Sequence, residues 1–590
     1  ESFIMAKCIK RAGIVFFATI LSLLLVIGTL NATGLVDSNS NSIVNTNTDN
    51  NIFSENVDYA NPENVQIPKK ENVNFEIPKA DFEYVLNHNY NCQDLATCTC
   101  LQNIWNEAVQ KSLDTNKNVK VTLMTDWVAR EVSANYFTSF GDGIGFDYGR
   151  ITVRGEITLD LNGFTIDRKA PETIDNGGGS SIIVWESILN LTDSSYDSNA
   201  IQQIYDNNKS LITEQDYKNR DFSNTTLVQQ LRQVKCGKIT GGKTNSGGAG
   251  GVIVFSDDKI TKSTLNMYGG MITGNEATIS GGVGCKIATE FNFFDGLIFD
   301  NKAQYGGGVY VTDGDFNMYG GKIIANLATN NGGGLFVSNR QMNFYDGLIG
   351  CNAATNHAGG IWVDTGLKNK ICSLQMYGGV VENNASKHGT GVTVYNSGYA
   401  RIYNGYIRNN YAVENSSGLL IWNTSKCEMF DGIISNNTTN SFTSGERGGA
   451  GVLVGHGSSF EMFNGQIVNN RLTTENETRV VEGAGLYLTT YPSDTANCIA
   501  KLHGGIIANN VIETPAGLST CGAGVIVSDV GRNVVNLEIN GAMQIYNNNA
   551  DGKISDVYLK NSNKLNINGS LIGNGMAHIG VDLASDFEGV

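Results

Sequence analysis

Two groups of residues have side chains that could carry acid–base chemistry. Asp257 and Asp258 are adjacent carboxylates, and a pair of carboxylates supplies the general acid and general base of glycoside cleavage. The second group is a single residue, His456, which stands between Gly455 and Gly457. The six histidines are scattered, and no Ser/His/Asp grouping accompanies them. We therefore interpret His456 as a turn residue and assign no catalytic residue, cofactor or metal ligand.

Aromatic residues recur at regular spacing and are the most unusual feature of the chain. Eight of them stand two residues before eight successive glycines: Tyr268, Phe294, Tyr319, Tyr345, Tyr377, Tyr403, Phe430 and Phe463. A second row, Tyr310, Phe336 and Trp362, occupies the middle of three successive phrases of the form Gly-aliphatic-x-aliphatic. If the flanking apolar residues point inward, alternation along a strand places both rows on the outer face.

Rows of exposed aromatic rings would form a binding ladder for carbohydrate or for a cell-surface partner, because a large exposed apolar patch usually marks an interaction site. The alternative is that a bend before each glycine reverses the alternation and buries the ring in the core. We prefer burial for the Tyr268 row and exposure for the Tyr310 row.

The residues that must position these rows belong to a repeat. The phrase Gly-x-aliphatic-x-x-Asn begins at glycines from Gly237 to Gly569, and the shortest gaps between them are 25 to 27 residues. Asparagine stands five residues after the glycine at Asn275, Asn301, Asn326, Asn352, Asn384, Asn410, Asn437, Asn470, Asn510 and Asn574. Stacked repeats would bring these side chains into one hydrogen-bonded ladder.

A period of about 25 residues with short strands and glycine bends predicts an all-β fold, a right-handed parallel β-helix. The Leu-x-x-Leu-x-Leu pattern of leucine-rich repeats is absent, and propeller blades need about 40 residues or more. Leu101, Trp105 and Ala108 recur at helical spacing, so we expect an amphipathic α-helix over 101–113 that caps the open N-terminal end.

The expected organisation has four parts. Lys7, Lys10 and Arg11 precede an apolar run over 14–30, which is typical of a secretory signal peptide at 1–33. A disordered Asn/Ser-rich linker over 34–80 and an N-terminal cap over 81–118 follow. The parallel β-helix fills 119–590, with an irregular loop excursion at 193–233.

Charge and export restrict the partners. The net charge of −16 and the pI near 4.9 argue against nucleic acid and against anionic lipid. The signal predicts a secreted or cell-surface protein whose mature chain has no membrane span. An uncleaved signal that anchors the chain is the alternative.

The cysteines give one candidate crosslink. Cys92, Cys98 and Cys100 are close enough in sequence to permit a disulfide after export. Later cysteines fall mostly at different phases of the repeat, so we expect most of them to be free. No Cys-x-x-Cys with partner histidines indicates a zinc site.

The repeat phrases resemble those of secreted right-handed parallel β-helix proteins. Gly269-Gly270-Met271-Ile272 and Gly320-Gly321-Lys322-Ile323 are most similar to the repeats of polymorphic outer-membrane proteins and surface adhesins, which share the pectate-lyase-like superfold. One departure is that the Phe-x-x-Asn of that family is Ile-x-x-Asn here. The resemblance implies an adhesin-like binding protein by analogy only.

The rival hypothesis is a β-helix polysaccharide lyase or glycoside hydrolase that uses the insertions at 193–233, 438–447 and 489–499. Gly455-His456-Gly457 is similar to a tripeptide of polygalacturonases. Asp257 and His456 lie seven coils apart, about 34 Å at the spacing of neighbouring strands, so they cannot act on one substrate.

Overall fold

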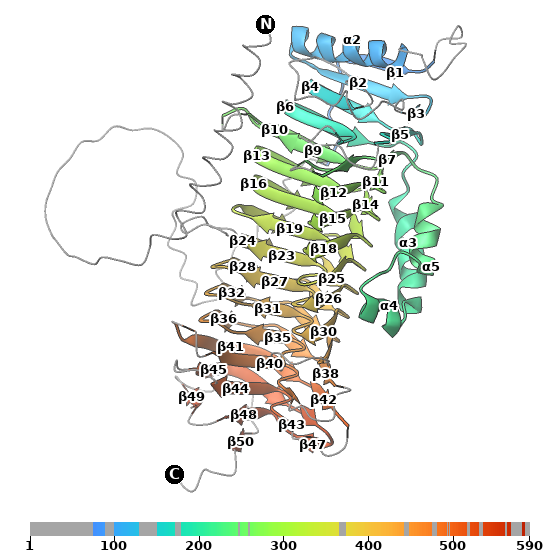
Figure 1. The fold of residues 1–590 in the computed structure, drawn as a ribbon. Helices are drawn as coiled ribbons and strands as arrows, with labels where there is room; N and C mark the ends of the chain where they lie inside the picture. Colours follow the sequence, from blue (N-terminus) through green and yellow to red (C-terminus); the bar gives the residue numbers. More distant parts are fainter. Residues whose placement is uncertain are drawn as a thin grey trace, which may run out of the picture. The chain divides into compact units, whose positions relative to one another are not determined.

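The structure is a computed structural model that describes residues 75–88, 100–128, 150–170, 179–245, 248–257, 260–364, 373–441, 448–474, 481–491, 494, 496–515, 518, 520–529, 535–560, 563, 565–567 and 581–583. Each repeat folds as one coil with four strand positions. Nearly all of the described strands pair in parallel with their counterparts in neighbouring coils, so they stack in four columns (Figure 1). The chain is therefore all-β in its main part, and its parallel stacks are consistent with a parallel β-helix.

The first two columns form one face. The first contains β9 (Val252–Phe255), β19 (Leu335–Ser338), β23 (Ile361–Asp364), β27 (Val392–Tyr395), β31 (Leu419–Ile421), β35 (Val452–Val454), β40 (Leu486–Thr490), β44 (Val525–Asp529), β48 (Val557–Leu559) and β50 (Val581–Leu583). The second contains β10 (Ser263–Met267), β20 (Gln341–Phe344), β24 (Ser373–Met376), β28 (Tyr399–Ile402), β32 (Lys426–Met429), β36 (Ser459–Met462) and β49 (Leu565–Ile567). The long strands β4 (Ile151–Asp160), β6 (Ile182–Thr192), β13 (Val283–Phe293) and β16 (Val309–Met318) run through both positions.

The third and fourth columns complete each coil. The third contains β3 (Trp127–Val128), β5 (Thr165–Asp167), β7 (Lys238–Thr240), β11 (Met271–Thr273), β14 (Leu297–Phe299), β17 (Lys322–Ile324), β21 (Leu348–Gly350), β25 (Val380–Glu382), β29 (Tyr406–Arg408), β33 (Ile433–Ser435) and β37 (Gln466–Val468), and β41 (Cys498–Ala508) and β45 (Val535–Tyr546) span the second and third. The fourth contains β8 (Lys243–Thr244), β12 (Glu276–Ile279), β15 (Lys302–Tyr305), β18 (Leu327–Asn331), β22 (Ala353–Ala354), β26 (Ala385–His388), β30 (Tyr411–Asn415), β34 (Thr438–Asn440), β38 (Arg471–Thr473), β42 (Val511–Glu513), β46 (Asn549–Ala550) and the antiparallel β47 (Lys553–Ile554). A separate pair joins β39 (Val481–Glu482) to β43 (Thr520–Cys521).

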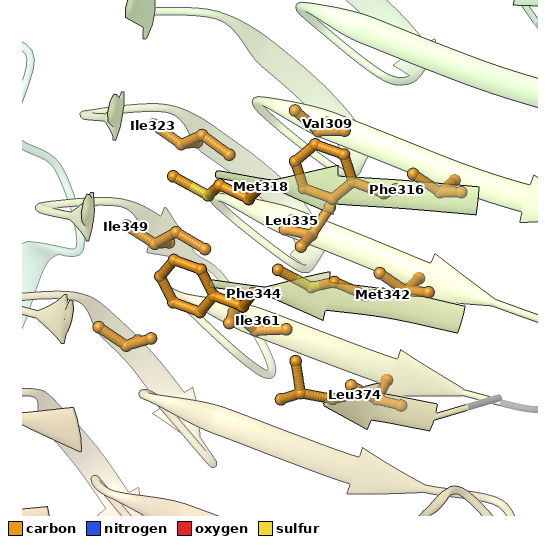
Figure 2. Packing of buried hydrophobic residues seen from close by; sticks show 14 of the residues in the cluster. Val309, Phe316, Met318, Ile323, Leu335, Met342, Phe344, Ile349, Ile361 and Leu374 are labelled. Atoms are coloured by element: carbon orange, nitrogen blue, oxygen red, sulfur yellow. The ribbon is translucent and has the colours of Figure 1, made fainter. Parts of the chain in front are cut away.

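Like residues stack on like in the interior. Val309 pairs with Leu335, Phe316 pairs with Met342, and Ile323 pairs with Ile349, and all six side chains are fully buried. Figure 2 shows these apolar side chains filling the space between the columns. Each added coil thus extends one continuous apolar core, which no single coil could form alone.

The glycine after each aromatic residue makes the bend between the second and third columns. Gly347 has φ 114°, and a Cβ there would lie 2.7 Å from Cε of Met318 in the preceding coil. A side chain would therefore both strain the backbone and clash with the core, which explains why glycine recurs at this position.

The N-terminal helix forms as the periodicity predicted. Helix α2 (Cys100–Thr115) packs on β1 (Phe82–Leu86), β2 (Asn118–Leu123) and β4. Trp105 is fully buried, and its Nε1 donates to the carbonyl of Thr152 at 3.0 Å. In Figure 1 the helix lies across the N-terminal end of the strand stack. No helix among the described residues is long and apolar enough to cross a membrane.

The prediction of an irregular loop at 193–233 is wrong, because this segment is helical. It contains α3 (Ser198–Asn208), the 3-10 helix η4 (Lys209–Leu211), α4 (Glu214–Asn219) and α5 (Thr226–Arg232), which we call the helical insert. Side chains of Asp197, Thr213 and Thr225 cap the three α-helices. Because the segment is rich in polar residues, its apolar helical face was not recognised in the sequence. This face packs on outward residues of the third column, including Met271, Leu297 and Leu348.

Tyr205 is the central contact of the helical insert. It is fully buried, and its hydroxyl accepts a hydrogen bond from Nδ2 of Asn383 at 3.0 Å. Replacing Tyr205 by phenylalanine should lower the free energy of unfolding by about 1–2 kcal/mol, because a buried amide donor loses its acceptor. Urea denaturation measures the effect, and Tyr406→Phe at an exposed site should change stability by less than about 0.5 kcal/mol. Equal costs for the two variants would contradict this role.

Candidate functional site

The Tyr268 row forms a continuous stack of rings on the outside of the second column. From Tyr268 to Phe463, and on to His503, successive ring centroids lie 4.7–5.1 Å apart with interplanar angles of 5–16°. None of these rings belongs to the interior cluster. All are partly exposed except Tyr403 and Phe430, which are 7% and 6% exposed and whose remaining open surface lines a groove. The interpretation that places this row in the core is therefore wrong. His503 was missed because it is not Phe, Tyr or Trp, although it too stands two residues before a repeat glycine, Gly505.

Only the edges of this aromatic stack are open to a ligand. Rings about 5 Å apart cover the faces of one another, so no sugar or base can enter between them. Phe75 shows how the stack is contacted, since it meets Phe294 and Tyr319 at 77° and 84° with centroids 5.5 and 6.0 Å away. Burial raises the pKa of Tyr319 to about 12, so its hydroxyl stays protonated and can donate a hydrogen bond at the edge.

Two grooves lie beside the edge of the stack. The C-terminal groove, about 610 Å³, is lined by Tyr403, Asn404, Phe430, Asp431, Phe463, Asn464, His503, Gly504, Gly505, Ile506, Ala542 and Gln544. The insert groove, about 670 Å³, lies between the stack and α3. Its charged side chains are Asp206, Lys209, Asp295, Lys322, Asp346, Glu382 and Arg408.

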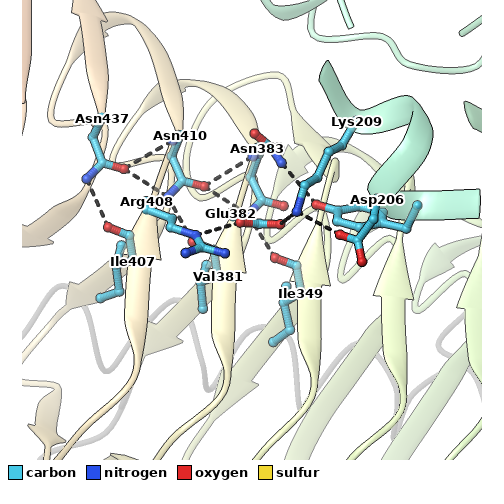
Figure 3. A network of polar contacts seen from close by, with 12 residues as sticks. Asp206, Lys209, Ile349, Val381, Glu382, Asn383, Ile407, Arg408, Asn410 and Asn437 are labelled. Carbon is cyan, nitrogen blue, oxygen red and sulfur yellow. Dashed lines mark hydrogen bonds and ion pairs between the residues drawn. The ribbon is translucent and has the colours of Figure 1, made fainter. Parts of the chain in front are cut away.

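A network of ion pairs forms one wall of the insert groove (Figure 3). Glu382 is 2% exposed and contacts Nε of Arg408 at 2.7 Å and Nζ of Lys209 at 3.1 Å. Lys209 also contacts Asp206 at 2.9 Å. Burial opposes the charge of Lys209, but these carboxylates outweigh it and raise the pKa of Lys209. The network therefore holds α3 against β25 and β29.

Lys322 is the most deeply placed cation of the insert groove. It is 7% exposed, and its Nζ donates to Oγ of Ser198 at 3.0 Å, which in turn donates to Asp295 at 3.0 Å. Burial lowers the pKa of Lys322, although nearby aspartates act in the opposite direction. No ion pair of Lys322 occurs among the described residues. This amine retains donors for a polar group that enters the groove.

The Tyr310 row also lies outside the interior, but it is covered. Its rings are 4.9 Å apart between Tyr310 and Phe336 and 5.9 Å apart between Phe336 and Trp362. Phe336 is 8% exposed and Trp362 is 4% exposed, because Tyr305 and His357 from the fourth column pack against them. The expectation that Phe336 and Trp362 form an exposed binding surface is wrong, since an outward position is not the same as an open one.

The repeat asparagines form a buried column. In each step, Oδ1 of one asparagine accepts from the backbone N–H and from Nδ2 of the asparagine in the preceding coil, as Asn437 does from Asn410 at 3.1 and 3.0 Å. The column runs from Asn275 to Asn510, continues to Asn548 and ends on Asp556. Asn574 lies outside the described residues. The role of this column is structural, because its amides are all bonded within it or to backbone.

The candidate acid–base residues do not meet. Asp257 follows β9, whereas His456 follows β35, seven strand steps along the first column. Asp258 lies outside the described residues. His456 contacts the buried carboxylate of Asp494 at 2.6 Å and stacks on Tyr491. Among the described residues, no group of three His, Cys, Asp or Glu side chains could hold a metal ion.

The candidate disulfide falls mostly outside the described residues, which exclude Cys92 and Cys98. Cys100 is buried in α2. Five described cysteines of the repeats are free thiols: Cys236, Cys285, Cys351, Cys427 and Cys498. They occupy mostly different positions within the repeat, and this keeps their side chains apart.

The geometry therefore defines a protein with stacked parallel strands and two grooves along one aromatic stack. No protein-family model, curated protein or solved structure matches this chain.

Proposed function

We propose that the chain is a right-handed parallel β-helix, capped by α2, that is secreted or displayed on a cell surface and binds carbohydrate. The observation that carries the proposal is the pair of grooves along one edge of the aromatic stack. Ring edges and tyrosine hydroxyls supply apolar and polar contacts side by side, which suits the mixed surface of a sugar. Adhesion to a host or neighbouring cell surface is the biological role that this binding would serve.

The polar groups of the grooves support a ligand rich in hydroxyl groups. In the insert groove, four carboxylates and three cations line the wall, so it both donates and accepts hydrogen bonds. Charge-assisted hydrogen bonds are stronger than neutral ones, and a hydroxyl can use either kind. A purely anionic ligand would be repelled, because carboxylates outnumber cations in this groove.

Binding of the full chain to a glycan array tests this function. For a glycan that binds in the insert groove, Lys322→Met should weaken affinity about tenfold, because a charged hydrogen bond contributes about 1.5–3 kcal/mol. For one that binds in the C-terminal groove, Asp431→Asn should do the same while keeping an oxygen for the turn. The control is Lys302→Met. Lys302 forms an exposed ion pair with Glu276, neither residue lines a groove, and this variant should bind normally. Absence of binding to any glycan, or binding that survives both groove variants, would overturn the proposal.

A polysaccharide lyase or glycoside hydrolase is the second candidate. It is favoured by the convergence of Lys322, Asp295 and Asp346 in one groove. Incubating the full chain with acidic and neutral polysaccharides and measuring new reducing ends or unsaturated products tests it. Product that disappears in Lys322→Met would favour the enzyme, and bound but uncleaved glycan would reject it.

A further inference from the structure

The C-terminal groove is built from five successive coils. Four of them contribute a ring of the stack and the residue after it, as Tyr403 and Asn404 do. The fifth contributes Ala542 and Gln544 of β45. The groove is therefore long in the direction of the stack, and each coil presents a similar set of groups to it.

The repeat along this groove is straight and regular. Centroids are 5.0 Å apart from Tyr403 to Phe430, 4.9 Å from Phe430 to Phe463 and 5.0 Å from Phe463 to His503. The rings rotate by only 9°, 5° and 16° in these steps. A straight ligand with a similar repeat can thus keep its register over the whole groove. An extended chain of β-1,4-linked pyranose rings advances by one sugar over a closely similar distance.

The polar groups of this groove are held in place and carry little charge. Oδ1 of Asp431 accepts from the N–H of Gly432 at 2.8 Å, and Oδ1 of Asn404 accepts from the N–H of Gly405 at 2.7 Å. These turns leave the second atom of each side chain, Oδ2 or Nδ2, for a ligand. Both nitrogens of His503 are engaged, with Glu461 and Asn540 at 2.9 Å each. Among the described residues that line this groove, Asp431 is the only one with a carboxylate, so the groove suits an uncharged ligand.

We propose that the C-terminal groove binds an uncharged, extended polysaccharide that runs parallel to the aromatic stack with one sugar for each coil. The ligand contacts the ring edges on one side and the row of Asn404, Asp431 and Asn464 on the other. This inference rests on the proposed carbohydrate-binding function and narrows it to a polymer class and a direction.

A length series tests the match of sugar to coil. Calorimetry with the full chain and linear β-1,4-linked oligomers of glucose, xylose, mannose and N-acetylglucosamine, from two to eight sugars, gives affinity against length. For the sugar that fits, affinity should rise roughly two- to tenfold per added unit, the worth of one net hydrogen bond, and level off near five units. Affinity that stops rising at two sugars would overturn the inference.

Variants locate the ligand. Gln544→Ala, at an exposed position at one end of the groove, should move the plateau from about five units to about four. Asn404→Asp keeps the turn oxygen but loses the Nδ2 donor, and should weaken a five-unit ligand about tenfold. Lys302→Met, at a residue that lines neither groove, should leave this binding unchanged. Glycan binding that is weakened by Lys322→Met, but by neither Gln544→Ala nor Asn404→Asp, overturns this inference and keeps the proposed function. Absence of binding to every glycan overturns both.

Discussion

Replacing Asn410 by alanine should lower the free energy of unfolding by about 4 kcal/mol. Asn410 is 1% exposed, and its Oδ1 accepts from the backbone N–H of Asn384 at 3.1 Å and from Nδ2 of Asn384 at 2.9 Å. Alanine leaves the backbone N–H of Asn384 and one of the two Nδ2 hydrogens buried without an acceptor, while Nδ2 still donates to the carbonyl of Ile349. Each such orphaned hydrogen costs about 1–3 kcal/mol. The carbonyl of Val381 also loses its side-chain donor.

Urea denaturation followed by circular dichroism measures this loss, and hydrogen exchange locates it in the coils around β29. Asn343→Ala is the matched control, because Asn343 belongs to a similar amide row on the outer face. Its Nδ2 donates to Asn317 at 2.8 Å, but the side chain is partly exposed and water can replace the bond. We expect its cost to stay below about 1 kcal/mol. A cost for Asn410→Ala no larger than that of Asn343→Ala would show that burial of the column contributes nothing.

Acid should destabilise the protein through His357. Burial above all, together with the nearby His388 and Lys387 and against the opposing charge of Glu414, lowers the pKa of this imidazole from 6.5 to about 3. The unfolded state therefore binds more protons than the folded state between these values. The stabilising contribution of the neutral ring is complete above pH 6.5 and is lost as the pH falls toward 3. The difference in pKa corresponds to at most about 5 kcal/mol.

The test measures the free energy of unfolding at several pH values between 3.5 and 8 for the parent chain and for His357→Gln. The difference between the two proteins separates the contribution of His357 from that of the carboxylates. Nδ1 of His357 has no hydrogen-bond partner, so glutamine sacrifices no bond at that atom. The parent should lose stability relative to the variant as the pH falls below 6.5. A difference between the two proteins that does not vary with pH would contradict the prediction.

His503→Gln is a control of opposite sign. A hydrogen bond with Glu461 raises the pKa of His503, so its contribution is present below pH 6.5 and is lost as the pH rises through the folded pKa. Relative to this variant, the parent should gain stability in acid. The two histidines thus separate burial from pairing as causes of pH dependence in one molecule.

The repeat phrases predicted the stacked strands well, because a fixed spacing brings equal positions together in neighbouring coils. The failures have local causes. Asn548 was missed because the chain carries an extra residue near Gly541, where the register between β41 and β45 shifts. The helical insert was missed because its apolar positions, such as Ile201 and Leu231, are diluted by Asn, Gln and Asp.

The sequence by itself therefore determined the coil repeat and the alternation along its strands, since glycine bends and alternation are properties of neighbouring residues. Only the tertiary structure decided which outward residues stay open. Trp362 is covered by His357 of the fourth column, whereas Tyr345 keeps an open edge in the stack. The Tyr205 hydroxyl meets Asn383 across 178 positions of sequence and fixes the helical insert on the strand stack. Such coverage depends on contacts between distant segments, which no local pattern records.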